Sequence, residues 1–127
     1  MKKYFYVAIM ALTLGMFASC TGTSIGKEPV CDDEAGTING KAYNNTDYAC
    51  YKITEDATET CTGEEPETMH YQYLDWCTEY QAQKTKANFE YSNNWSAYAY
   101  GVGCNCKGTC TIEKTDHTED ECYTSNL

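Results

Sequence analysis

Nine cysteines are the residues of this 127-residue chain with the most evident chemistry. Eight of them follow residue 30: Cys31, Cys50, Cys61, Cys77, Cys104, Cys106, Cys110 and Cys122. So many cysteines in a short chain indicate an oxidising compartment, where an even number favours disulfides. We therefore expect four disulfides, and because eight cysteines allow 105 pairings, the pairing itself stays open. The cluster Cys104-x-Cys106-x3-Cys110 could instead hold zinc together with His70 or His117. The cluster lacks a Cys-x2-Cys pair, so we expect neither a metal nor a cofactor.

The two histidines and the acidic clusters are the other candidates for chemistry. His70 and His117 could act as general bases, but neither lies in a catalytic motif, so surface positions are the simpler interpretation. Acidic residues cluster at 32–34, 64–67 and 119–121. Carboxylates can bind calcium, but the loop spacing that calcium sites require is missing. The sequence therefore predicts no catalytic residue and a solvated acidic surface.

Aromatic side chains are the residues most suited to binding a ligand. Flat rings can stack on sugar rings, and Asn and Thr side chains beside them can form hydrogen bonds with the sugar hydroxyls. Most rings must fill the core, because aliphatic side chains are scarce. Tyr71 falls off the apolar stripe of the helix expected around it, and Trp95 follows Asn93 and Asn94 at the start of an expected strand. These two rings are the predicted ligand-binding candidates.

The N-terminus has the pattern of an export signal. Lys2 and Lys3 precede fifteen mostly apolar residues, 4–18, and as a helix these would span about 22 Å, short of a bilayer core of about 30 Å. Small residues then precede Cys20. This segment resembles the lipobox of bacterial lipoproteins, although Phe17 stands where that family usually has an aliphatic residue. The resemblance covers about twenty residues, and an ordinary signal peptide cut after Gly22 is the alternative.

The lipobox resemblance implies a location. Signal peptidase II would cut before Cys20, and acyl chains such as palmitate on that cysteine would anchor the protein to a membrane. In such families a residue other than Asp after the cysteine permits export to the outer membrane, and Thr21 meets that condition. The expected location is the cell envelope, with the periplasmic or surface face left open.

The charge of the chain limits the classes of partner that it can bind. Nineteen acidic residues against nine lysines give a net charge of −10, and there is no arginine. Nucleic acid is excluded as a partner, because phosphate binding needs a basic face. Without arginine, the chain also has no side chain that binds a phosphate or carboxylate group through two parallel hydrogen bonds. Neutral glycans, cations and basic proteins remain.

The expected fold class is α+β: a small disulfide-rich domain with one helix packed on an antiparallel sheet. Residues 1–19 are the expected signal peptide, 20–30 a lipidated tether and 31–127 the domain. Asn39-Gly40 predicts a hairpin within 37–43, and a strand is expected over 48–53. We expect a loop over 54–67, a helix over 66–86, a strand over 95–106, a turn at Lys107-Gly108 and a tail held by Cys122.

The resulting functional expectation is a non-enzymatic envelope module that binds or packs against a protein or a neutral glycan. One alternative is a cystine-rich inhibitor or toxin-like scaffold, in which an exposed loop over 54–65 would make the contacts. A small hydrolase that uses paired carboxylates is a weaker alternative, because one sequence does not show the separation between the two acids.

Overall fold

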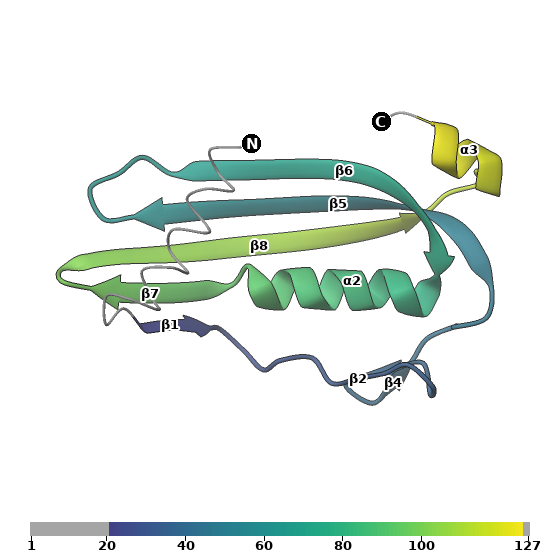
Figure 1. Cartoon of the computed structure of the whole chain (residues 1–127), viewed down its shortest axis with the longest axis horizontal. Helices are drawn as coiled ribbons and strands as arrows, with labels where there is room; N and C mark the ends of the chain where they lie inside the picture. The colour runs from purple at the N-terminus through teal and green to yellow at the C-terminus, as the bar shows by residue number, and fades with distance from the viewer. Residues whose placement is uncertain (1–20, 126–127) are drawn as a thin grey trace.

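The computed structural model describes residues 21–125 and consists mostly of antiparallel sheet. Its main sheet has five strands in the order β1-β7-β8-β5-β6, and every neighbouring pair is antiparallel (Figure 1). The strands are β1 (Thr21–Ser24), β5 (Tyr48–Cys61), β6 (Glu67–Thr78), β7 (Trp95–Ala99) and β8 (Val102–Lys114). Long helix α2 (Glu79–Ser92) joins β6 to β7 and packs on one side of the sheet. The predicted small domain with a helix on an antiparallel sheet is therefore present, although strands dominate it.

Helix α2 begins thirteen residues later than the sequence pattern indicated, so the helix predicted over 66–86 is wrong in its first half. Thr78 caps the helix: its hydroxyl accepts a hydrogen bond from the Gln81 backbone, and the Gln81 side chain accepts one from the Thr78 backbone. The preceding segment pairs with β5 along its whole length, from Glu67 to Thr78. Its Thr, Tyr and Trp side chains suit a pleated sheet, and pairing overrode the helical spacing of its apolar residues. The loop expected over 54–67 is likewise strand as far as Cys61.

A small three-stranded sheet lies between β1 and β5 in the chain and contains the predicted hairpin. Its strands are β2 (Cys31–Asp32), β3 (Thr37–Ile38) and β4 (Lys41–Ala42). Asn39 and Gly40 have φ of 51° and 81°, so the Asn-Gly turn is confirmed. Asp33 fixes this sheet to α2 by accepting from the Tyr80 hydroxyl and from Lys84, each at 2.8 Å. Both bonds lower the pKa of the Asp33 carboxyl, and the bond from Lys84 has the larger effect.

The long strand predicted over 95–106 is instead a hairpin of β7 and β8. Tyr100 and Gly101 form its turn with φ of 52° and 80°, the conformation of a tight two-residue hairpin turn. A tyrosine rarely adopts positive φ, so this turn was hard to predict from its residues.

The turn predicted at Lys107-Gly108 is also wrong, since β8 continues through both residues. Glycine is needed there for packing: a Cβ at Gly108 would lie 2.6 Å from the Cβ of Asn93. The backbone of β8 therefore approaches the end of α2 closely, and the Asn94 amide donates to the Gly108 carbonyl at 2.9 Å.

The core lies between the sheet and α2, in two clusters. One contains Ala57, Trp95, Ala97 and Cys106; the other contains Tyr51, Ile53, Cys77, Ala82 and Cys110. Phe89 of α2 packs against both clusters and joins them. Since side chains alternate along a strand, the strand residues next to these core residues point to the opposite side of the sheet. We call that opposite side the polar face.

Two of the four expected disulfides are formed among the described residues. Cys61 and Cys104 are partners across β5 and β8, and Cys50 binds Cys122 of helix α3 (Glu119–Thr124), which confirms that Cys122 holds the tail. Cys77 and Cys110 cannot pair, because they lie opposite Ala49 and Glu55, six positions apart along β5. Six positions are about 20 Å, whereas disulfides need Cα atoms within about 7 Å.

The expected tether begins with strand β1, whose residues Thr21–Ser24 pair with β7. Cys20 and the predicted signal peptide lie outside the described residues. Within residues 21–125, no helix combines the length and the apolar character needed to cross a membrane.

Candidate functional site

The polar face of the main sheet is rich in hydroxyl groups. Threonines face each other across neighbouring strands: Thr54 opposes Thr111, and Thr58 opposes Thr68. The face also carries Ser96 and Tyr98 from β7 and Asn105 from β8. Hydroxyl and amide side chains both donate and accept hydrogen bonds, so this face matches a ligand with many hydroxyl groups.

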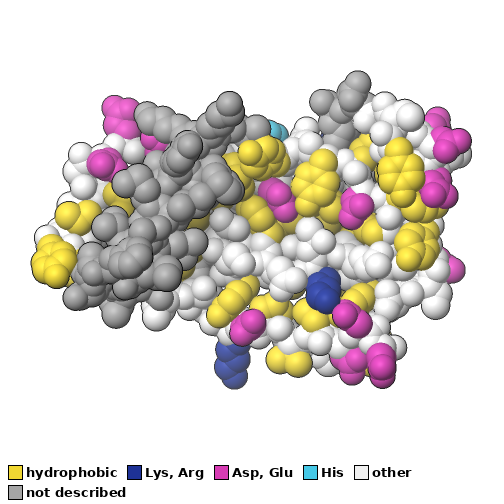
Figure 2. Space-filling view, in the orientation of Figure 1, with side chains coloured by type: hydrophobic (Ala, Val, Ile, Leu, Met, Phe, Trp, Pro, Cys, Tyr) yellow, Lys and Arg dark blue, Asp and Glu magenta, His cyan; other side chains and the backbone are white. Residues whose placement is uncertain are grey.

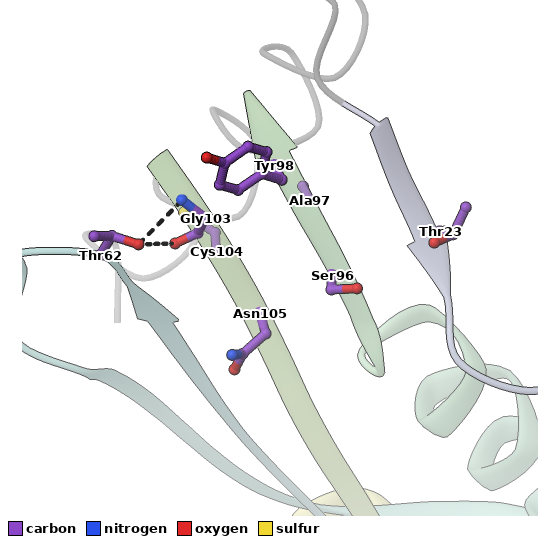
Figure 3. A pocket seen from close by; sticks show the side chains of 8 residues that line it. All are labelled: Thr23, Thr62, Ser96, Ala97, Tyr98, Gly103, Cys104 and Asn105. Carbon is purple, nitrogen blue, oxygen red and sulfur yellow. Dashed lines mark hydrogen bonds between the residues drawn. The ribbon is translucent and has the colours of Figure 1, made fainter. Parts of the chain in front are cut away.

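A shallow pocket of about 430 Å³ lies at the β7–β8 end of this face. Figure 3 shows its lining from β1, β7, β8 and the loop after β5: Thr23, Thr62, Ser96, Ala97, Tyr98, Gly103, Cys104 and Asn105. None of these eight side chains carries a charge. Thr62 holds its loop against β8, because its hydroxyl bonds both the amide and the carbonyl of Gly103 at 3.1 Å (Figure 3).

Tyr98 is the largest side chain of this pocket, and it is 62% exposed. It pairs with Gly103 across the hairpin, and a Cβ at Gly103 would lie 3.3 Å from the tyrosine ring. The Tyr98 ring therefore lies beside Gly103, which has no side chain to cover it, and most of the ring is open to solvent. An exposed ring supported by backbone, with Ser96 and Asn105 beside it, can stack on a sugar ring and orient its hydroxyls.

The rings predicted from sequence do not form this site. Trp95 is 9% exposed and belongs to the core, because it points to the α2 side of β7 beside Cys106. Tyr71 is 37% exposed, as expected, but it lies on edge strand β6 and not on a helix. By the register of the strands, Tyr71 and Trp95 lie on the α2 side of the sheet, and Tyr98 lies on the polar face.

The two histidines lie apart from the pocket. His70 pairs with Asp56 across β6 and β5 on the polar face, where both side chains are exposed. His117 lies in the segment between β8 and α3 and is exposed. The three acidic clusters lie at the β2–β3 turn, the β5–β6 loop and the start of α3. In α3, Glu121 accepts from the Thr118 backbone, which lowers its pKa. This contact and those of Asp33 give structural roles to acids of the third and the first cluster.

Glu59 is an unusual buried acid at 2% exposure, and its Oε2 has no partner among the described residues. Burial raises the pKa of Glu59, as do Glu64 and Glu67 to a smaller extent. Its carboxylate lies near the sulfurs of Cys61 and Cys104, the only cluster of metal-ligating atoms found over residues 21–125. Those two sulfurs are bonded to each other, so neither is a thiolate that could bind zinc.

The thiols of Cys77 on β6 and Cys110 on β8 are poor nucleophiles. Burial raises the pKa of Cys77 to about 12 and that of Cys110 to about 11, so both are protonated at neutral pH. Cys31 is half-buried on β2, and Cys106 is buried beside Trp95. By strand register, Cys77 and Cys110 lie on the α2 side of the sheet, and His70 lies on the polar face.

Tyr98 lies on a strand, as predicted, but its place in the site depends on the hairpin that replaces the single strand expected over 95–106. The turn at Tyr100-Gly101 reverses the chain and pairs Tyr98 with Gly103 across the hairpin. The comparisons with known proteins give no further guide: no protein-family model, curated protein or solved structure matches this chain.

Proposed function

We propose that this protein is a cell-envelope lipoprotein whose domain binds neutral glycans, without catalysis, at the Tyr98 pocket. The observation that carries the proposal is the exposed Tyr98 ring in an uncharged pocket of a chain with a net charge of −10. An acidic surface repels anionic ligands, and an uncharged lining offers a cation no carboxylate to pair with. A neutral ligand with hydroxyl groups fits both conditions.

Tyr98→Ala is expected to weaken glycan binding about tenfold, which corresponds to about 1.4 kcal/mol of lost ring contact. The measurement is binding of the purified protein to an array of neutral glycans, followed by titration with the best of them. Tyr123→Ala is the matched control, because Tyr123 is 69% exposed on α3, away from the pocket. Absence of binding to every neutral glycan, or equal loss in both variants, would contradict the proposal.

The anchoring part of the proposal depends on Cys20. Cells that express the protein should incorporate labelled palmitate into it, and Cys20→Ser should abolish the label and release the protein from membranes. The wild-type chain and Cys31→Ser serve as controls, since both keep the proposed acylation site. Labelling that persists in Cys20→Ser would contradict acylation at Cys20, and a wild-type protein without label would favour the ordinary signal peptide cut after Gly22.

A further inference from the structure

Strand β6 forms one edge of the five-stranded sheet. Its twelve residues, Glu67–Thr78, pair with β5 on one side, and within residues 21–125 no strand pairs with the other side. The backbone groups along the outer side of an edge strand can pair with another chain, and many peptide-binding proteins use such an edge. The chemistry around β6 therefore indicates which peptide would suit it.

The hairpin of β5 and β6 carries much of the negative charge of the chain. Residues 48–78 contain one lysine, Lys52, and seven acidic residues, a net charge of −6 out of −10 for the whole chain. The acidic residues are Glu55, Asp56, Glu59, Glu64, Glu65, Glu67 and Asp75. Such a field attracts basic segments and opposes a second copy of this acidic chain.

Aromatic rings lie between these acids on the α2 side of β6. Tyr71 is 37% exposed, and the half-buried Tyr73 donates its hydroxyl to Glu55 at 3.1 Å. Figure 2 shows this side, with hydrophobic and acidic side chains intermingled over β5 and β6. A lysine or arginine placed here would meet a carboxylate and the face of a ring together.

We propose that the outer edge of β6 binds an extended lysine- or arginine-rich segment of a partner protein, which adds to the sheet as a sixth strand. Backbone hydrogen bonds supply the pairing, and Glu55, Asp75 and Tyr71 select basic side chains. This interaction uses the edge of the sheet and leaves the Tyr98 pocket on the polar face free, so it does not depend on the proposed glycan binding.

The test uses a ten-residue peptide of alternating lysine and threonine, titrated into the purified protein at about 0.15 M salt, where exposed charges are screened beyond about 8 Å. We expect binding, together with slower hydrogen exchange of β6 amides. Glu55→Gln with Asp75→Asn should weaken binding at least about fivefold, a loss of about 1 kcal/mol. Glu28→Gln with Glu113→Gln removes the same charge from exposed positions outside the hairpin and should change binding less than twofold.

The same peptide with methylated backbone amides separates strand addition from simple charge attraction, because it keeps every lysine but cannot donate backbone hydrogen bonds. It should bind at least tenfold more weakly. The proposal is overturned if the methylated peptide binds as well as its parent, if both double variants lose affinity equally, or if the unmodified peptide does not bind.

Discussion

Replacing Cys50 and Cys122 together by alanine is expected to lower the free energy of unfolding by about 3.5 kcal/mol. This disulfide joins residues 72 positions apart and ties α3 to β5. The Cys61–Cys104 disulfide lies inside that loop and shortens its effective length to roughly thirty residues. The Cys50–Cys122 disulfide therefore restricts the unfolded chain less than a lone link over 72 positions would. Urea unfolding of the wild type and the double variant gives the difference.

Cys31→Ala is the control for that experiment, since Cys31 is half-buried and forms no disulfide in the structure. It should change the stability by less than about 0.5 kcal/mol. Peptide mapping of the unreduced protein should recover the Cys50–Cys122 and Cys61–Cys104 links. A double variant as stable as the wild type, or a map with four different links, would show that the disulfide framework described above is incorrect.

Ile53→Ala is expected to lower the free energy of unfolding by about 3 to 4 kcal/mol. Ile53 is completely buried at the centre of β5, in contact with the cluster that lies under α2. Few other aliphatic side chains are present to fill the space that the substitution leaves, so little relaxation is expected. Urea unfolding measures the loss, and Ile53→Val should cost about 1 kcal/mol because it removes one methylene group.

Ile25→Ala is the matched control for Ile53, because the same change is made at a side chain that is 64% exposed. We expect a change within about 0.5 kcal/mol. Similar losses in Ile25→Ala and Ile53→Ala would mean that burial under α2 does not determine the stability of this domain.

The local elements were predictable where one signal was strong. Asn39-Gly40 predicted its hairpin because both residues tolerate positive φ. Helix α2 has such a signal at its start, Thr78-Glu79-Tyr80-Gln81, but the apolar spacing around it predicts a helix that begins at residue 66. That spacing is helical, and the pairing of β6 with β5 overrode it as far as Thr78.

The candidate site depended on pairings that no local pattern contains. Trp95 and Tyr98 are close in sequence, but they point to opposite sides of the sheet, so one fills the core and the other lies open to solvent. Gly103 is needed beside Tyr98, and it reaches that position through the turn at Tyr100-Gly101. A list of aromatic residues therefore could not show which ring would be available to a ligand.

Composition by itself determined the acidity of this protein, its shortage of aliphatic side chains and its high cysteine content, because these properties are sums over residues. Tertiary structure alone decided which cysteines pair, which side of the sheet α2 covers and which strand forms the edge. These outcomes depend on strand register, since a shift of one residue would exchange the buried and exposed sides of every strand.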